Sequence, residues 1–533
     1  MPEKRLSTLL AAAEGTLHGA GDPPVRGLRY DSREVRPGEL FAALPGLHVD
    51  GHNYLRDAVD RGAVAVMVDR GHVETAAGLG VPVVAVEQPR RALSAVAAAF
   101  YDHPSRDLRV IGVTGTDGKS STVSFIEQLL SATGHPAGLV STVSLKTADA
   151  PRGNEARQST PEAPHLHGYL AEMRGAGKEF AVVEATSHGL SPRTSRLADV
   201  CFKTAVFTNL SHEHLEFHGS FEQYRRDKSE LFRALDAAPG DAFGVVNAAD
   251  ANTAYFEEAT KRPVLRYASI GSADGGGPAE HGPAERGQTV SDAARLDLVA
   301  TDIEAGPESI TFSVVVPGVS SRPVYLPMPG EFQVDNVLAA LLTVSQATAR
   351  PALELAEHVP HLTPLEGRLF PVGRNLPFSV VVDYAHTPAS YEKLFPMMRR
   401  TTSGRIIAVF GSAGERDVEK RALQGATAAR HCELVVLCDE DPRGEDRLRI
   451  LRDIEHGIRS AEGADYLIVP DRREAIRAAV DRAQPGDTVL LLGKGHEKSI
   501  IYADGPRPWN EAEVAAEVLA EAGHDIPLPE VAG

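Results

Sequence analysis

A glycine-rich stretch with one lysine follows an apolar run near residue 110. The stretch from Gly112 to Thr122 reads GVTGTDGKSST, and apolar residues at helical spacing continue to Gly134. Glycines at this point let backbone N–H groups surround a phosphate at the positive end of the helix. Lys119 would reach the terminal phosphates, and Ser120 would offer its hydroxyl to Mg²⁺. The strict GxxxxGK[ST] spacing fails because residue 113 is valine, yet the pattern favours a nucleotide site over a plain glycine turn.

A glutamate at the end of the next predicted strand is placed to complete such a site. Residues 180–183 are typical of a buried strand, and Glu184 comes directly after them. In a phosphate-loop enzyme, a carboxylate at a neighbouring strand end binds Mg²⁺ or orients the attacking group. The alternative is that Thr186 and Ser187 begin a helix and that the glutamate is incidental.

Histidines follow a third predicted strand, over residues 204–208. His214 and His218 are four residues apart, and on a helix this spacing places both side chains on one face, as metal ligands require. The HExxH pattern is absent, which disfavours a zinc protease. Ten residues after His218, Lys228 taken by itself is typical of a solvated surface lysine.

The rest of the chain alternates short apolar runs with stretches of helical periodicity, which predicts α/β domains. We expect an N-terminal domain over residues 1–104 and a central, phosphate-loop ATPase-type domain with a parallel sheet over 105–351. A C-terminal domain with a doubly wound, Rossmann-like sheet is expected over 352–533. The low-complexity segment 271–292 cannot build a core, so it is predicted to be a surface loop.

The C-terminal domain repeats strand and helix regularly, and its parallel strands should end at one edge, where doubly wound sheets bind ligands. Helical periodicity predicts a helix over 472–483. Strands are expected at 380–382, 406–410, 434–437, 466–469 and 488–492. The residues just past four of these strands are Asp383, Gly411, Asp439 and Gly493.

Composition excludes several classes of protein. The chain has 533 residues and a formal net charge of -18, so the basic surface of a nucleic-acid-binding protein is not expected. No apolar run approaches the roughly 20 residues that span a membrane, and Glu14 interrupts the apolar start too early for a signal peptide. The cysteines Cys201, Cys432 and Cys438 form no CxxC pair, which favours free thiols over disulfides. We therefore expect a cytoplasmic protein.

Taken in order, the motifs resemble those of the Mur ligase family of ADP-forming amide ligases. Within that family the resemblance is to the members that add the third, diamino, residue of the peptidoglycan stem peptide. It covers all three predicted domains. The motifs are TGTDGKSST, VEATSHGL, TNLSHEHLEFHG, RRDKSELF, MPGEFQVDN, LEGR, VVDYAHTP, FGSAGERD, DEDPRGED and LGKGHE.

The resemblance implies an N-terminal domain that holds a UDP-sugar, a central domain that binds ATP and Mg²⁺, and a C-terminal domain that holds an amino acid. The implied catalytic residues are Lys119, Lys228 and His214. The implied Mg²⁺ ligands are Ser120, Glu184, His214 and a carbamylated Lys228. The implied ATP contacts are Thr114, Gly115, Thr116, Asp117, Gly118, Lys119, Ser120, Asn336, Arg368, Asp383 and His386. The implied substrate contacts are Ser32 on the uridine side and Ser159, Thr160, Thr186 and Arg196 on the muramoyl-dipeptide. The implied contacts to the incoming amino acid are Arg416, Glu440, Asp441, Pro442, Arg443, Gly493 and Glu497.

The implied reaction joins meso-diaminopimelate, L-lysine or L-ornithine to the D-Glu of UDP-N-acetylmuramoyl-L-Ala-D-Glu. The D-Glu carboxylate attacks the γ-phosphate of ATP, and the amine then attacks the acyl phosphate to give the amide, ADP and phosphate. Lys119 and Mg²⁺ would neutralise charge on the transferring oxygens. Because acyl phosphates hydrolyse, the C-terminal domain is expected to close over the site.

The chain departs from the family pattern at several of these positions. Asp117 stands where asparagine is usual, and two residues are inserted before Arg196. Glu440-Asp441 replaces the Asp-Asn of diaminopimelate-adding members, and an acidic Asp441 would favour a free ammonium group. Arg443 could still bind a second carboxylate through a bidentate pair. The identity of the diamino acid therefore stays open.

Two alternatives remain. One is another amide ligase of the same superfamily, similar to folylpolyglutamate synthase. The other is a phosphate-loop nucleotide switch whose C-terminal sheet binds a partner and which forms no amide. They differ in whether ATP cleavage requires both a carboxylate substrate and an amine. No pattern in the sequence sets an oligomeric state.

Overall fold

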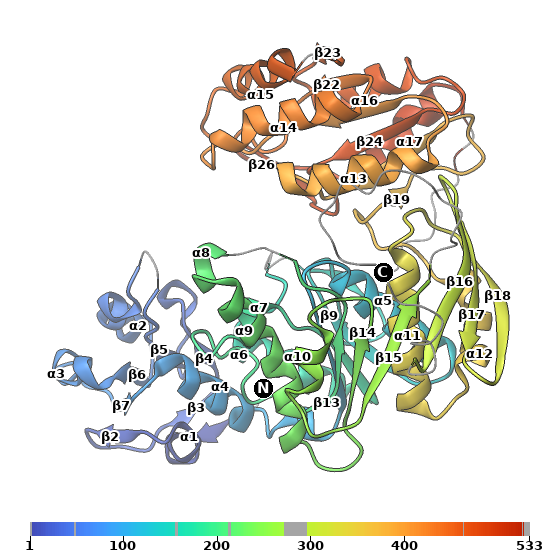
Figure 1. Cartoon of the computed structure of the whole chain (residues 1–533). Helices are drawn as coiled ribbons and strands as arrows, with labels where there is room; N and C mark the ends of the chain where they lie inside the picture. The colour runs from blue at the N-terminus through green and yellow to red at the C-terminus, as the bar shows by residue number, and fades with distance from the viewer. Residues whose placement is uncertain are drawn as a thin grey trace.

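The computed structural model describes residues 3–46, 49–154, 158–211, 215–270, 296–461, 463–524 and 526. Figure 1 shows three successive α/β units, coloured from blue through green and yellow to red. Their main sheets fall within residues 16–86, 109–326 and 370–492, inside the three predicted domains, whose boundaries stay predictions. The predicted loop at 271–292 lies outside the described residues. Within the described ranges, no helix has the length and apolar character to cross a membrane.

The N-terminal sheet is covered on both faces. In spatial order its strands are β2 (Thr16–His18), β7 (Val83–Val86), β6 (Ala65–Asp69), β5 (Leu40–Ala42) and β4 (Leu28–Arg29). Only β2 is antiparallel to its neighbour. Helices α1 (Leu6–Ala13) and α4 (Pro89–Phe100) pack on one face, and α2 (Leu55–Asp60) and α3 (Val73–Ala76) on the other. A separate ladder joins β1 (Lys4–Arg5) and β3 (Pro24–Val25).

The central sheet has parallel strands in its middle and antiparallel strands at both edges. Its middle strands, in spatial order, are β9 (Ala137–Val140), β12 (Phe180–Glu184), β8 (Arg109–Thr114), β13 (Phe202–Phe207), β14 (Phe243–Asn247), β15 (Val264–Ser269) and β16 (Leu298–Ala305). Antiparallel strands extend it: β10 (Ser144–Lys146) and β11 (Arg152–Gly153) at one edge, and β17 (Ile310–Val316) and β18 (Ser320–Leu326) at the other. The strand ends after β8, β12 and β13 therefore lie side by side, as the site requires.

Helices bury both faces of the central sheet. On one face pack α5 (Lys119–Ala132), α11 (Gln333–Thr348) and α12 (Ala352–Leu355), and on the other α6 (Ala163–Gly175) and α9 (Phe221–Ala234). Shorter helices are α7 (Ser187–Leu190), α8 (Leu215–His218) and α10 (Thr253–Glu257). Val123, Ile126 and Leu129 of α5 are fully buried, which confirms the helix predicted after the glycine-rich loop.

The C-terminal sheet is doubly wound, as predicted. In spatial order its strands are β19 (Phe370–Pro371), β20 (Ser379–Asp383), β24 (Thr488–Leu492), β21 (Ile406–Phe410), β22 (Leu434–Leu437) and β23 (Asp465–Ile468), and only β19 is antiparallel. One face carries α13 (Pro388–Thr401), α14 (Glu419–His431) and α15 (Arg447–Ala461), and the other α16 (Arg472–Val480) and α17 (Glu511–Glu521). A hairpin joins β25 (Ser499–Tyr502) and β26 (Gly505–Pro508).

A buried histidine in α6 should make the protein sensitive to acid. His167 is fully buried, and burial lowers the pKa of its side chain from 6.5 to about 4. Between about pH 6.5 and about pH 4 this histidine is protonated in the unfolded chain but neutral in the folded chain. The free energy of unfolding therefore falls as the pH drops through this range, by roughly 3 kcal/mol in total. We expect urea unfolding of the His167→Leu variant to lose this part of the pH dependence. Equal pH dependence in both proteins would contradict the prediction.

Candidate active site

The loop between β8 and α5 has a backbone that only glycine permits at two positions. Gly115 has φ +152° and Gly118 has φ +82°. A side-chain carbon at Gly115 would lie 1.9 Å from Thr208 Oγ1, and one at Gly118 would lie 2.3 Å from Asn336 Oδ1. The first backbone N–H groups of α5 have no acceptor within the helix. The loop therefore has the form of an anion cradle, with Lys119 at its rim donating to Thr116 O at 2.7 Å.

Ser120 and Glu184 meet at the ends of neighbouring strands. Ser120 Oγ donates to Glu184 Oε2 at 2.9 Å, and the same carboxylate oxygen accepts from the backbone N–H and the hydroxyl of Thr142, each at 2.9 Å. Thr142 Oγ1 also lies 2.7 Å from Ser159 Oγ, whose hydroxyl can donate to it. Glu184 is only 2% exposed. The result is a compact set of oxygen atoms beside the phosphate loop, which is the ligand type that Mg²⁺ prefers.

Lys228 is buried against the same loop. Its side chain, from α9, is 2% exposed, and its Nζ donates to Gly115 O at 2.5 Å. The ammonium also lies 4.6 Å from the centre of the Tyr224 ring, whose hydroxyl is 3.1 Å from Thr116 Oγ1. Residue type and spacing alone indicated a surface lysine, and that interpretation is wrong. The missing signal was its place on the buried face of α9.

The two histidines of the predicted pair have different outcomes. His214 lies outside the described residues. His218 ends α8 and is buried, with Nδ1 donating to Asp227 Oδ2 at 2.8 Å and Nε2 lying 3.0 Å from Ser187 Oγ. Because both ring nitrogens have side-chain partners, His218 holds the segments after β12 and β13 together.

The residues assigned to the muramoyl substrate form one cluster next to Glu184. Thr160 Oγ1 lies 2.9 Å from Thr186 Oγ1 and donates to the carbonyl of Glu184 at 2.8 Å. Arg196 donates to Thr160 O at 2.8 Å and pairs with Glu162 at 2.9 Å. The structure therefore brings Thr160, Thr186 and Arg196 together, while Glu162 was not found from the sequence.

Glu162 also connects this cluster to the N-terminal unit. Arg90 of α4 pairs with it at 3.1 Å. The Tyr30 ring packs 5.7 Å from that of His165 in α6, and burial together with Glu162 raises the pKa of Tyr30 to about 12. Ser32, two residues further on, is 6% exposed at the start of a 3-10 turn. The segment that carries Ser32 therefore packs against the helix next to the Thr160 cluster.

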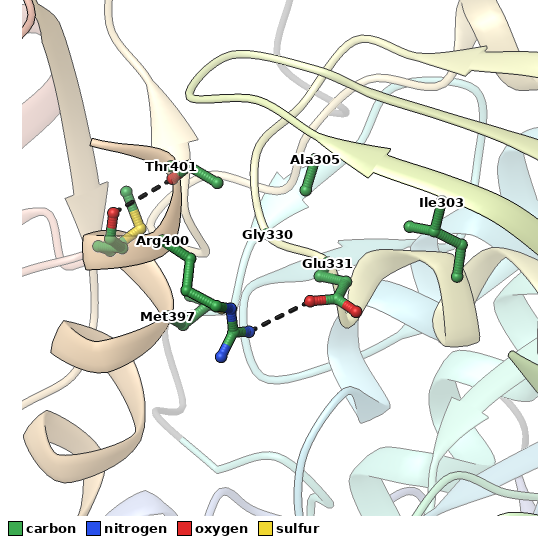
Figure 2. A pocket seen from close by; sticks show the side chains of 8 residues that line it. Ile303, Ala305, Gly330, Glu331, Met397, Arg400 and Thr401 are labelled. Carbon is green, nitrogen blue, oxygen red and sulfur yellow. Dashed lines mark hydrogen bonds and ion pairs between the residues drawn. The ribbon is translucent and has the colours of Figure 1, made fainter. Parts of the chain in front are cut away.

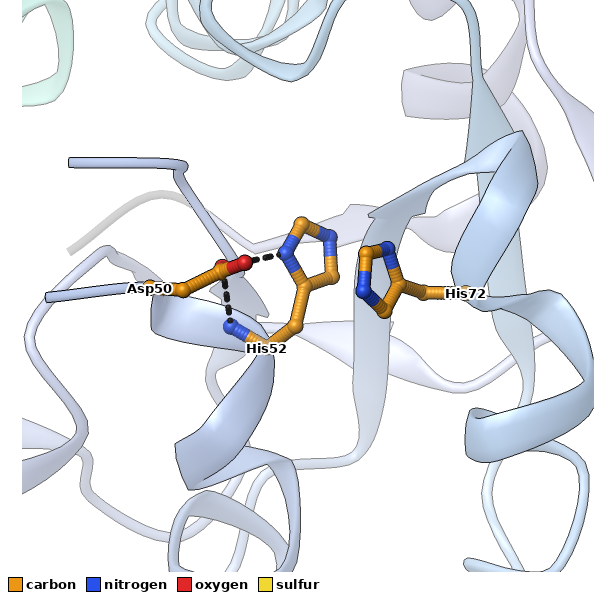
Figure 3. A group of neighbouring side chains, drawn as sticks. All are labelled: Asp50, His52 and His72. Carbon is orange, nitrogen blue, oxygen red and sulfur yellow. Dashed lines mark hydrogen bonds and ion pairs between the residues drawn. The ribbon is translucent and has the colours of Figure 1, made fainter.

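A second polar group in the N-terminal unit, shown in Figure 3, has ligand types that suit a metal. His52 Nδ1 donates to Asp50 Oδ1 at 2.6 Å, its Nε2 accepts from the Asp69 N–H at 3.3 Å, and His72 Nδ1 donates to Asp69 Oδ1 at 2.8 Å. The two imidazole rings are stacked at 3.8 Å and 15°. Lone pairs of nearly parallel rings do not converge on one ion at the roughly 2 Å that a histidine ligand needs. We therefore interpret the group as a hydrogen-bonded support for this end of the sheet.

On the other side of the phosphate loop lies the start of α11. Asn336 is 3% exposed, accepts from Thr122 Oγ1 at 3.2 Å and donates to Gln333 Oε1 at 2.8 Å. Its amide lies so close to Gly118 that a side chain at that position would collide with it. Asn336 thus lies beside the loop, and its contact with ATP stays a prediction.

Three of the residues predicted to contact ATP, namely Arg368, Asp383 and His386, lie at or near the end of β20. The Asp383 carboxylate accepts the backbone N–H groups of Leu369 and Ala385, each at 2.8 Å. Burial raises the pKa of Asp383, although Arg368 and these two amides act against the increase. The Arg368 guanidinium lies 5.2 Å from the Tyr384 ring centre, and His386 Nδ1 donates to Tyr384 O at 2.8 Å.

All the residues assigned to the amino acid except Arg416 follow β22 or β24. Lys494 is fully buried, and its Nζ donates to Asp441 Oδ1 at 2.8 Å and to Glu497 Oε2 at 2.6 Å. Asp441 Oδ1 also accepts the Ile501 N–H at 3.0 Å. The charge of Asp441 is therefore balanced inside the protein, which removes the reason to expect it to attract an additional ammonium group. Lys494 was missed as a partner, although the LGKGHE motif contains it.

Glu440 is the acidic group of this cluster that keeps an unused oxygen. Its side chain is 8% exposed, and in the described part of the chain no hydrogen-bond donor reaches its buried Oε2. Gly493, with φ +95°, leaves room next to it, since a side-chain carbon there would lie 3.1 Å from Glu440 Oε2. Burial raises the pKa of Glu440, opposed by Lys420 and His386. Arg443, at φ +54°, donates its backbone N–H to Ile501 O at 2.9 Å, while Arg416 is exposed before α14.

A buried ion pair between the first residues of α16 and α17 supports these strand ends. Arg472 and Glu511, at the starts of α16 and α17, are 1% and 0% exposed and pair at 2.6 Å. The guanidinium also donates to Asp439 O at 3.0 Å and to Leu492 O at 2.8 Å. Because one carbonyl lies just past β22 and the other ends β24, the pair links the two strand ends.

Comparison with known proteins identifies the family. Residues 24–101 match the Mur ligase family, catalytic domain; residues 113–344 match the Mur ligase middle domain; and residues 367–495 match the Mur ligase, glutamate ligase domain. A protein named UDP-N-acetylmuramyl-tripeptide synthetase from Roseiflexus sp. (strain RS-1) is 45% identical over 513 residues, which cover 94% of this chain and 96% of the relative. The chain belongs to the Mur ligase family.

Other relatives of this Mur ligase agree with the assignment. A UDP-N-acetylmuramoyl-L-alanyl-D-glutamate--2,6-diaminopimelate ligase from Geobacillus thermodenitrificans is 36% identical, covering 97% of this chain and 99% of the relative. A solved structure of a ligase with that name has a TM-score of 0.62 and 28% identity, covering 94% of this chain and 96% of the other. The three-unit arrangement of the Mur ligase is thus shared along nearly its whole length.

Proposed function

We propose that this Mur ligase is an ATP-dependent, ADP-forming ligase of peptidoglycan synthesis. It would join a diamino acid to the D-Glu carboxylate of UDP-N-acetylmuramoyl-L-Ala-D-Glu. The observation that carries the proposal is the convergence of the phosphate loop, the Ser120–Glu184 pair and buried Lys228 at adjacent strand ends. The names of the relatives supply the substrate class.

The residues present fit ATP and Mg²⁺. Gly115 and Gly118 leave a cradle that a side-chain carbon would fill, and the helix start behind it suits a phosphate. Ser120 and Glu184 would hold Mg²⁺ through oxygen atoms, and a carbamylated Lys228 would add two more oxygens next to Gly115. Bound there, the ion would neutralise charge on the transferring phosphoryl oxygens.

The chain's own residues would position the first step. The Thr160–Thr186–Arg196 cluster lies beside Glu184 and would orient the muramoyl-dipeptide so that its D-Glu carboxylate faces the γ-phosphate. Lys119 would stabilise the charge that develops on the phosphoryl oxygens, a positioning and electrostatic role that typically dominates phosphoryl transfer. The products of this step are ADP and an acyl phosphate.

The second step would use the strand ends of the C-terminal sheet. Glu440 offers a buried carboxylate oxygen that suits the ammonium of an amino acid, and Arg443 suits a carboxylate. The amine would attack the acyl carbon, and the tetrahedral intermediate would collapse to amide and phosphate. Lys393 of α13 already reaches Asp117 of the phosphate loop, and closer approach of the C-terminal unit would reduce the access of water to the acyl phosphate.

The test is ADP release with UDP-N-acetylmuramoyl-L-Ala-D-Glu present, comparing meso-diaminopimelate, L-lysine and L-ornithine. We expect ADP to form only when the muramoyl-dipeptide and one of the amines are both present, and a product larger than the dipeptide by that amino acid. The matched control omits the muramoyl-dipeptide. ATP turnover that ignored all three amines would instead indicate another ligase of the superfamily or a nucleotide switch.

A further inference from the structure

One face of α13 is turned toward the central unit and reaches it through two exposed ion pairs. Lys393, Met397 and Arg400 are spaced four and three residues apart, so they share that face. In Figure 1, α13 lies on the side of the C-terminal sheet that faces the central sheet, and Figure 2 shows Arg400 of α13 reaching Glu331, which lies just before α11. Arg400 pairs with Glu331 at 3.2 Å, and a cavity of about 200 Å³ separates the two units beside this pair.

Lys393 reaches the phosphate loop itself. Its Nζ donates to Asp117 Oδ2 at 2.8 Å and to Ser211 Oγ at 3.3 Å. The backbone of Asp117 is fixed independently, because its N–H donates to Asn209 Oδ1 at 2.9 Å and its carbonyl accepts from Thr208 Oγ1 at 2.7 Å. The C-terminal unit therefore places a second lysine at the loop, in addition to Lys119.

Lys393 compensates for the negative charge of Asp117 in the phosphate loop. Partial desolvation acts to raise the pKa of Asp117, yet attraction to Lys393, and further to Lys119 and Arg368, leaves that pKa below its ordinary value. Asp117 is therefore ionised at neutral pH, in a loop built to receive a polyphosphate. An uncompensated carboxylate there would repel the phosphates.

We propose that Lys393 is a positioning residue of the nucleotide site: from the C-terminal unit it supplies the positive charge that compensates for Asp117, so that ATP binds tightly only when α13 is docked on the phosphate loop. This inference rests on the proposed ATP site. The side chains of Lys393 and Asp117 are 57% and 60% exposed, and such a pair by itself adds little to domain docking. The Lys393–Asp117 pair instead makes the local charge at the phosphate loop less negative, and this raises the affinity for the nucleotide.

A double-mutant cycle on ATP binding tests the proposal, using full-length protein, MgATP and no muramoyl substrate. We expect Lys393→Gln to weaken ATP binding by roughly ten-fold at low salt. Asp117→Asn should bind ATP at least as tightly as the wild type, and the Asp117→Asn/Lys393→Gln double variant should return to near the wild-type affinity. High salt should shrink the effect of Lys393→Gln, because exposed charges are screened.

Arg400→Gln is the matched control, because it removes an exposed ion pair from the same face of α13 without changing the charge at the phosphate loop. Asp117→Asn should not rescue whatever loss Arg400→Gln causes. If wild-type protein failed to bind ATP, the proposed function itself would fail. If the wild type bound ATP but Lys393→Gln bound it equally well, or if Asp117→Asn did not rescue Lys393→Gln, only the role of Lys393 would be refuted.

Discussion

Replacing Lys119 by alanine is expected to lower ADP formation by roughly 10³-fold while leaving the fold intact. The Lys119 ammonium stands at the rim of the phosphate loop, where its Nζ donates to Thr116 O. A phosphoryl-transfer site works mainly by positioning and charge, so losing one well-placed cation costs two to three orders of magnitude. The measurement is the rate of ADP release at saturating concentrations of all three substrates.

Lys261→Ala is the control for this variant, since Lys261 is an exposed lysine of the same central unit, away from the loop. It should keep the wild-type rate. Thermal unfolding of both variants would show whether the loss comes from misfolding. Full activity of Lys119→Ala would refute the phosphate-loop assignment.

Lys228→Ala should lose at least 100-fold in ADP formation, and short carboxylates should restore part of the rate. Lys228 is buried next to Gly115 O, inside the predicted nucleotide site. If its Nζ carries a carbamate, the alanine variant lacks a carboxylate and leaves a space of matching size. Acetate or formate can then enter that space and supply the missing oxygens.

Methylammonium provides the decisive comparison for Lys228. A lysine that acted as an ammonium would be rescued by methylammonium and not by acetate. Rescue by the amine alone would therefore contradict the carbamate role, and wild-type rates in Lys228→Ala would remove any role in catalysis. The rate of wild-type protein depleted of carbon dioxide, before and after adding hydrogencarbonate, measures the same modification independently.

Much of the fold followed from local patterns in the sequence. The strand–loop–helix around Lys119 and the strands of the C-terminal sheet are short apolar runs bounded by glycine or acidic residues, and such runs report on burial directly. Glu184 and Asp383 were found for the same reason, because each is the first acidic residue after an apolar run, and each is the last residue of its strand. The helix expected over 472–483 ends at Val480, where the apolar spacing gives way to a turn.

Residues that act through long-range pairs could not be found in this way. Lys393 is 276 positions from Asp117, and nothing in the sequence near either residue indicates the other. Lys228 had the wrong environment assigned because an isolated charged residue on a polar helix is usually solvated. The sequence also contained no sign that Lys494 pairs with Asp441. The charge of Asp441 was therefore expected to be available to a substrate, whereas Lys494 balances it.

The buried Arg472–Glu511 pair has a consequence for how amine preference could change during evolution. Since the guanidinium spans the ends of β22 and β24, the backbone around Glu440 and Gly493 is held as one preformed block. A different amino acid must then be accommodated by exchanging side chains on a constant frame. We therefore expect a change of amine preference to come from exchanging side chains such as Glu440 on this frame, with the loops and the phosphate chemistry on the neighbouring sheet unchanged.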